Sequence, residues 1–190
     1  MNQDEYFSVH TGLTINVEPL AQGEQLPDAL AFSQEIPPLF RVASECSGLE
    51  EGVEQSLANL VKDDSKPLLD YLAAQNSKIN LLLSFVLSQQ DDPALRYTTE
   101  TFGASRLTFL SKNAFSVGSL ARVKLFLDKP PAAVYCYAEV IDSQAKNGLF
   151  EITLKYNRLL EDDRDLLIRA ALYIQQKLLR QRAQQRTDTQ

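Results

Sequence analysis

Several residue types and patterns are scarce or missing in this chain of 190 residues. It has no Trp, one His, two Cys, seven Gly and eight Pro. No apolar run approaches the roughly 18 residues that cross a bilayer, so the sequence predicts no membrane span. Cys46 and Cys136 lie far apart in the sequence, which argues against a disulfide framework and favours a reducing, cytoplasmic environment. The acidic start at residues 1–6 does not resemble a secretory signal.

The scarcity of His and Cys also bears on catalysis. A Ser-His-Asp triad requires an imidazole, and the only one, His10, lies in the N-terminal segment. Cys136 alternates with apolar neighbours and is expected in the core, whereas Cys46 has no evident activator. The sequence contains neither a zinc ligand pattern nor a Gly-rich nucleotide motif, and the acidic residues within 161–165 are more typical of a helix start than of a metal site. We therefore expect no catalytic residue, no metal site and no enzyme activity.

Charge is unevenly distributed along the chain. Residues 1–65 contain 12 acidic and 2 basic side chains, a balance of −10. Residues 66–190 contain 13 acidic and 17 basic side chains, a balance of +4, and the formal charge of the whole chain is −6. Because the excess of basic residues is mild and they do not alternate with aromatics along a strand, we expect no binding to a nucleic-acid polymer.

Alternation of apolar and polar residues predicts a set of short strands. One lies at 13–17, and the rest of the first 49 residues has a loop-like composition apart from a short apolar run at 39–43. Turn signals separate the later strands, which favours an antiparallel sheet, and closure into a small barrel would remove its edges. These later strands are expected at 95–102, 107–110, 120–127, 133–141 and 149–157.

Helical periodicity appears in three places, at 50–63, at 67–90 and after residue 160. We therefore expect one α+β domain, in which a small antiparallel β-barrel carries two inserted helices and a C-terminal helix. Its parts are an N-terminal segment at 1–49 that contributes a strand, an inserted helical pair at 50–90, the main barrel strands at 91–160 and a C-terminal helix at 161–186.

Two of these helices carry apolar seams with heptad spacing. In the second helix the seam advances by steps of 4 and 3, and Leu69, Leu83 and Leu87 widen it. This width suggests packing on two sides, on its own domain and on other helices, although a core helix with no role in assembly is the alternative. We expect the seams to form an oligomer interface of Leu68, Leu72, Gln75, Ile79, Leu82 and Val86 with Leu167, Ala171, Ile174 and Leu178.

The order of these elements resembles a PilZ domain, a small bacterial β-barrel whose familiar role is to bind cyclic di-GMP. The resemblance rests on the turn TFGASRLTFLS at 101–111, a strand after Gly118, a Pro-marked hairpin, a last strand and the helix LEDDRDLLIRAALYIQQKLLRQR at 160–182. The helices that precede most of the barrel resemble the atypical PilZ subfamily, in which inserted long helices build a tetramer. The resemblance implies a PilZ-like barrel that forms a homotetramer.

The ligand motifs of PilZ domains are not intact in this chain. The family pattern is R-x-x-x-R before the barrel, whose guanidinium groups fork onto phosphates, and [D/N]-x-S-x-x-G at the turn. The turn positions fall on Thr101, Gly103 and Arg106, and Arg41 is followed four residues later by Glu45. We therefore expect no cyclic di-GMP binding through the usual motif, and no other cofactor.

Basic residues near the turn leave an alternative open. Arg96, Arg106 and Lys112 could form a rearranged patch for cyclic di-GMP, or they could be solvated charges at the barrel rim. We favour a non-catalytic bacterial signalling or adaptor protein of the cytoplasm that associates with itself and with another signalling protein. The alternative is a genuine cyclic di-GMP receptor that uses the rearranged patch.

Overall fold

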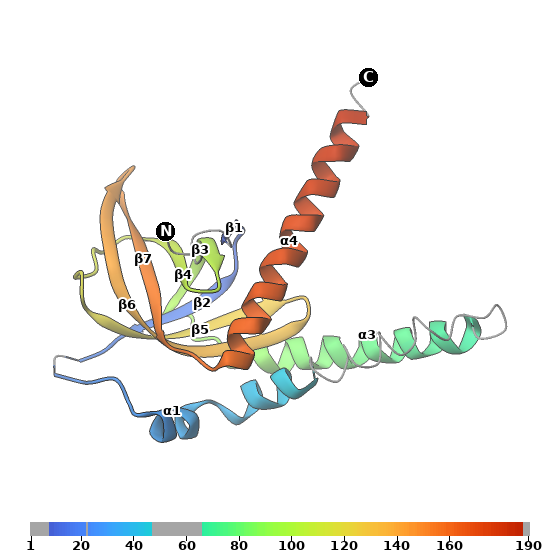
Figure 1. Ribbon diagram of the computed structural model, residues 1–190, viewed down its shortest axis with the longest axis horizontal. Helices are drawn as coiled ribbons and strands as arrows, with labels where there is room; N and C mark the ends of the chain where they lie inside the picture. Colours follow the sequence, from blue (N-terminus) through green and yellow to red (C-terminus); the bar gives the residue numbers. More distant parts are fainter. Residues whose placement is uncertain (1–7, 22, 47–65, 188–190) are drawn as a thin grey trace.

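The computed structural model describes residues 8–21, 23–46 and 66–187 (Figure 1). The predicted helix at 50–63 lies outside these described residues. In the parts that are described, none of the helices combines the length and the apolar composition needed to cross a membrane.

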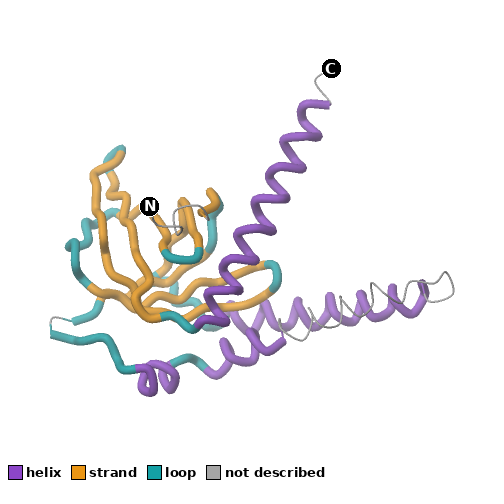
Figure 2. Tube along the Cα trace, viewed as in Figure 1, coloured by secondary structure: helices purple, strands orange, loops and turns teal. Residues whose placement is uncertain are grey.

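Six antiparallel strands form a closed barrel (Figures 1 and 2). Around the barrel their order is β3, β2, β5, β6, β7 and β4, and pairing between β3 and β4 closes the ring. A short strand that the sequence did not predict, β1 (Ser8–His10), adds to β3. The predicted antiparallel barrel with added helices is confirmed. The six strands are β2 (Thr14–Pro19), β3 (Arg96–Gly103), β4 (Arg106–Ser111), β5 (Leu120–Asp128), β6 (Pro131–Lys146) and β7 (Leu149–Arg158).

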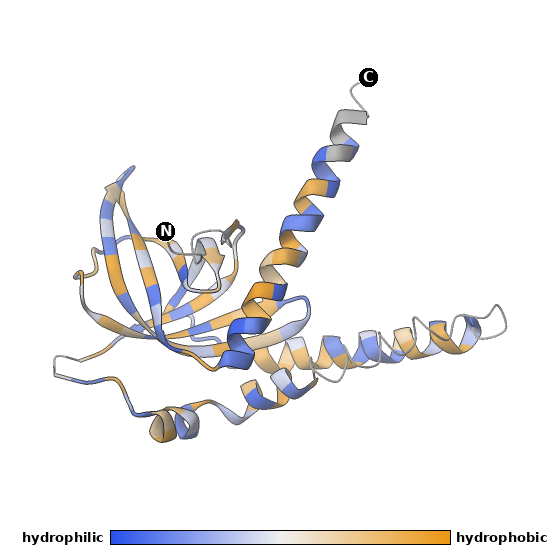
Figure 3. Ribbon diagram, in the orientation of Figure 1, coloured by the Kyte–Doolittle hydropathy of each residue, from blue (hydrophilic) through white to orange (hydrophobic). Residues whose placement is uncertain are grey.

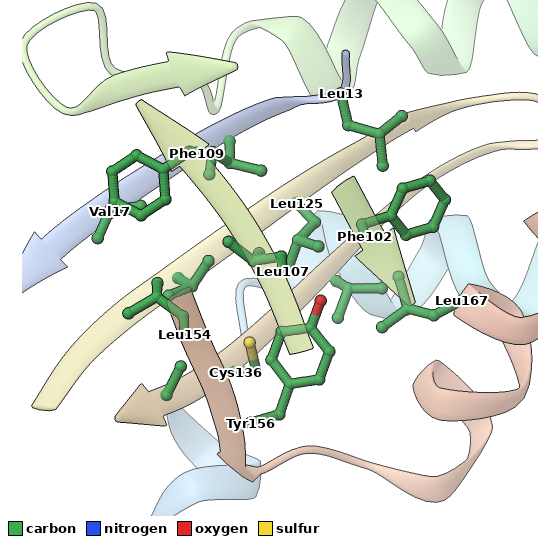
Figure 4. Packing of buried hydrophobic residues seen from close by; sticks show 14 of the residues in the cluster. Leu13, Val17, Phe102, Leu107, Phe109, Leu125, Cys136, Leu154, Tyr156 and Leu167 are labelled. Carbon is green, nitrogen blue, oxygen red and sulfur yellow. The ribbon is translucent and has the colours of Figure 1, made fainter. Parts of the chain in front are cut away.

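Alternate residues of the strands fill the inside of the barrel (Figure 4). On β5 the inward residues include Val123 and Leu125, and their partners on β6 are Cys136 and Val134. Cys136 is fully buried, as its alternation with apolar neighbours predicted. Residues 131–138 of β6 are buried on both faces, so the outer face of this strand must also be covered.

Helices cover that outer face and form a second core. It contains side chains from α1 (Ala29–Glu35), from a helical segment at 38–46 and from α3 (Lys66–Ser88). These side chains pack against β6, and the buried members are Phe32, Ile36, Phe40, Ala43, Leu87, Ala133, Tyr135 and Tyr137. The loop-like interpretation of the N-terminal segment is therefore wrong, because two helices lie between 29 and 46.

The C-terminal helix α4 (Glu161–Thr187) packs on the barrel only through its first half. Leu167 and Ala171 are buried in the barrel core of their own chain. The prediction that these two residues lie at an oligomer interface is wrong, because a side chain enclosed by its own barrel is not available to a second chain. The second half of α4 extends away from the barrel (Figure 1).

The second core predicts a large penalty for truncating Phe32, whose side chain is only 2% exposed. Replacing Phe32 with Ala should lower the free energy of unfolding by about 3–5 kcal/mol, because a buried ring is removed and a cavity remains. The matched control is Leu30→Ala in the same helix, where the side chain is 71% exposed and the loss should be small. Urea unfolding monitored by circular dichroism measures both, and equal effects would contradict this packing.

Candidate functional site

The most distinctive surface of the molecule is an apolar face on α3, whose ribbon carries several hydrophobic segments among hydrophilic ones (Figure 3). Large apolar side chains are exposed in two stretches of the helix, at 68–72 and at 79–86, and Leu82, for example, is 67% exposed. Soluble proteins rarely leave large apolar patches uncovered unless the patches bind something. We call this surface the α3 face, and it consists of Leu68, Tyr71, Leu72, Ile79, Leu81, Leu82, Phe85 and Val86.

The α3 face includes most of the predicted seam. Leu68, Leu72, Ile79, Leu82 and Val86 are exposed, and Gln75 between them is partly buried. At about 100° per residue, Tyr71, Leu81 and Phe85 extend the face to about half of the helix circumference. A stripe of about 100° is enough for one contact, so this face is wide enough for more than one neighbouring helix.

A different side of α3 packs on the helix's own domain. Leu87 is buried in the second core and Leu83 packs against it. The sequence predicted that these residues widen the seam towards a second contact, and the structure agrees. In the C-terminal helix, Ile174 packs against the barrel core and Leu178 is partly exposed.

The predicted basic residues do not come together. Arg106 begins β4 at the turn of the β3–β4 hairpin, whereas Arg96 begins β3 and Lys112 follows β4 at the other end. At about 3.3 Å per residue, the seven steps of β3 separate the two ends by about 20 Å. Arg96 also forms an ion pair with Asp91 at 2.6 Å. The three residues therefore do not form one rearranged patch, because the strand register places Arg106 at one end of the hairpin and Arg96 and Lys112 at the other.

Internal contacts occupy the polar groups of the turn. The hydroxyl groups of Thr101 and Thr108 lie 2.8 Å apart across the hairpin. Gly103 is buried and pairs with Ser8 of β1. From α4, the Arg164 guanidinium donates to the Ala104 carbonyl at 3.0 Å. Each contact satisfies a group that a ligand would otherwise need to reach.

A polar network that the sequence analysis missed fastens the N-terminal helices to the barrel. Tyr137 and Tyr135 on β6 both donate to the Glu35 carboxylate, at 2.5 Å and 3.3 Å. Arg122 on β5 donates to the Tyr137 hydroxyl at 3.1 Å and pairs with Glu24. Burial and the nearby Glu35 carboxylate raise the pKa of both tyrosines above the ordinary value, although Arg122 acts in the opposite direction. Spacing in the sequence gives no signal for such a network, because its partners lie about 100 residues apart.

Buried titratable groups lie under the start of α4. Asp163 is 4% exposed, and the Ser44 hydroxyl donates to its carboxylate at 3.3 Å. Burial raises the pKa of Asp163 to about 6. The thiol of Cys136 also has a raised pKa because it is fully buried, which disfavours the nucleophilic thiolate. Within the described ranges, no three His, Cys, Asp or Glu side chains are grouped so that they could hold a metal ion.

His10 and Arg41 lie apart from these groups. His10 is an exposed residue of β1, and Arg41 lies on the helical segment at 38–46, where its side chain donates to the Ser33 carbonyl. Glu45 lies on the same segment and is exposed. Arg41 is therefore already bonded within the chain, and the assignment of Arg41 and Glu45 to the position of a paired arginine clamp stays a prediction.

Comparison with known proteins decides the fold. No family model and no curated protein matches the chain. Among solved structures, a tetrameric PilZ domain protein of Xanthomonas campestris, self-assembled via a helical bundle, matches with a TM-score of 0.58 and 15% identity, over 92% of this chain and 91% of that one. The inhibitor of motility MotI/DgrA of Bacillus subtilis matches with a TM-score of 0.50 and 10% identity, over 93% of this chain and 53% of that one.

The chain has a PilZ-type fold. This agrees with the resemblance found in the sequence. The assignment of Thr101, Gly103 and Arg106 to the positions of a ligand motif stays a prediction, and contacts within the chain engage Thr101 and Gly103.

The raised pKa of Asp163 predicts a specific dependence of stability on pH. A carboxyl group with a raised pKa favours the folded state in its neutral form, so its contribution is lost as pH rises from about 4 to about 6. Replacing Asp163 with Asn should therefore stabilise the protein at pH 7.5 by about 1–3 kcal/mol and have little effect at pH 4.

Urea unfolding at both pH values measures this difference. The matched control is Asp162→Asn, which changes an exposed carboxylate in the same turn of α4. The control should show no comparable gain at pH 7.5. An Asp163→Asn chain that is less stable than the original at pH 7.5 would contradict the role of burial.

Proposed function

We propose that this chain is a non-catalytic, PilZ-like signalling or adaptor protein of the cytoplasm that assembles with itself through the α3 face. The observation that carries the proposal is the row of eight large apolar side chains exposed along α3. A helix with one side packed on its own domain and the other in solvent is arranged to bind further helices.

Burial of the α3 face would supply the free energy of assembly. Fully covering one Leu, Ile or Phe side chain contributes about 1.5–3 kcal/mol, and each copy brings eight large apolar side chains. Within α3 the only charged residues are Lys66, Asp70 and Lys78. Few charges therefore need to be desolvated or separated when helices of several copies come together.

The width of the α3 face supports a bundle of more than two helices. A dimer of single helices covers a narrow seam on each copy. Here Phe85 and Leu81 lie outside that seam and would stay exposed in such a dimer. The Xanthomonas campestris protein with the same fold is a tetramer built by a helical bundle. We infer a tetramer for this chain as well.

The adaptor role follows from what the barrel offers. At its β3–β4 turn, a hydroxyl group, a glycine and a carbonyl group are already engaged in contacts within the chain. A ligand would have to displace these contacts. Its buried cysteine has a raised pKa because it is fully buried, and this disfavours the nucleophilic thiolate. We infer that the barrel acts as a rigid platform for the helices and for a partner protein, and not as a catalyst.

The assembly is tested with a double variant in which Ile79 and Leu82 are both replaced with Asp. Two carboxylates would be buried in the interface of every copy, at a cost of at least about 3 kcal/mol per copy, or more than 100-fold in the association constant. Light scattering after size exclusion should show four times the mass of one chain for the original protein and a lower mass for the double variant.

The control is Ser77→Asp, which adds one carboxylate, half the charge of the double variant, on α3 outside the α3 face. This variant should keep the mass of the original protein, and all three proteins should keep the β signal in circular dichroism. An original protein that is a monomer at micromolar concentration, or a double variant of unchanged mass, would refute self-association through this face.

Ligand binding at the barrel is tested separately by calorimetric titration with cyclic di-GMP. We expect no binding at micromolar concentration, because the paired arginine clamp is absent and charge-assisted bonds worth about 1.5–3 kcal/mol each are lost. Micromolar binding that disappears in Arg96→Ala or Arg106→Ala would instead establish the receptor. Arg180→Ala, at an exposed arginine on α4, serves as the control.

A further inference from the structure

A groove lies between the middle of α4, from Ala170 to Gln181, and the hairpin that joins β5 and β6, with residues 11–13 beside it. Its volume is about 280 Å³. Tyr173 of α4 forms part of its lining and is half exposed. Its apolar lining also includes Leu13, Leu127, Ala170, Ile174 and Leu178. Ile174 and Leu178, which the sequence placed at an oligomer interface, thus line a separate surface that includes no residue of α3.

The rim of the groove is polar and mainly basic. Lys129 of the hairpin and Lys177 of α4 line it, together with one carboxylate, Asp128. In the described chain no ion pair joins either lysine to a carboxylate. The surrounding helix adds to the positive field, because residues 166–187 contain five basic residues and no Asp or Glu.

The size of the groove favours side chains of a peptide over a whole small molecule. Pockets for small molecules usually measure about 300–1,000 Å³ and enclose most of their ligand. This groove lies at the lower edge of that range, and it is bounded by a helix that continues beyond the barrel (Figure 1). One or two bulky apolar side chains fit between α4 and the hairpin, and the adjacent residues of the same peptide would run along the basic rim.

We propose that this groove binds an acidic segment of another protein, which inserts bulky apolar side chains against Ile174 and Leu178. Its Asp or Glu residues pair with Lys129 and Lys177 at the rim. The apolar contacts supply most of the affinity, while the exposed charges set the preference for an acidic partner and weaken as salt rises. The proposal names the partner chemistry of the adaptor role, and it requires no contribution from the α3 face.

A library of random peptides displayed on phage is the probe for this groove. Peptides are selected on the original protein after depletion on the Leu178→Glu chain, and the enriched peptides are synthesised and titrated. We expect sequences that combine bulky apolar residues with Asp or Glu. Their binding should fall at least 10-fold in Leu178→Glu and several-fold in Lys177→Glu, with the second loss smaller in high salt.

The control variant is Lys155→Glu, which reverses an exposed lysine on β7 outside the groove and should leave binding unchanged. If circular dichroism shows that Leu178→Glu does not fold, Lys177→Glu replaces it in the depletion step, and the loss of peptide binding in Lys177→Glu then tests the proposal. Failure to enrich any peptide, enrichment of basic peptides, or equal binding to the groove variants would each overturn the proposal. Light scattering on the same variants separates this result from any failure of self-association.

Discussion

The burial of both faces of β6 is the constraint on which the rest of this structure depends. One face of the strand closes the barrel with Val134 and Cys136, and the other face meets Phe32, Phe40 and Leu87 from the helical side. A strand buried on both sides must have a cover, and here the cover consists of short N-terminal helices and the end of α3. Because only the end of α3 is used in this way, most of the helix stands clear of the barrel (Figure 1). The large apolar side chains of the α3 face are therefore exposed.

The same arrangement explains why polar groups gather at two places around the cover. Arg122, Tyr137 and Glu35 join the barrel to α1 by directional bonds, which fix how the N-terminal helices lie on β6. Asp163 and Ser44 join α4 to the segment at 38–46. Asp163 carries a cost, because its carboxylate is desolvated, and hydrophobic packing alone would not require it. Hydrogen bonds of this kind select one orientation among several that would bury similar apolar area.

Much of the barrel could be predicted from the sequence, because its signal is local. Strands β5 to β7 alternate apolar and polar residues and are separated by turn residues, and these two local signals were enough to predict the strands. The N-terminal helices were missed because each is short, although Asp28 caps α1 and Phe32, Ile36 and Phe40 repeat every four residues. Heptad spacing located the apolar seam of α3, most of which is exposed, and its role as an oligomer interface stays a prediction. In α4 the heptad spacing reflected packing on the barrel. Periodicity identifies an apolar face, but only the tertiary structure shows what covers that face.

The β3–β4 hairpin carries the reason why we propose that this chain does not bind a nucleotide. A phosphate clamp requires cations that converge, and in this chain the hairpin register holds Arg96 and Arg106 at opposite ends. A nucleotide site at this turn would require further cations and also the displacement of Arg164 from the Ala104 carbonyl, a contact that links α4 to the turn. That contact helps to seat the first half of α4, and α4 in turn forms one wall of the groove beside the β5–β6 hairpin. The residues at the turn thus support the helical surfaces, which is why we propose binding between proteins and not binding of a nucleotide.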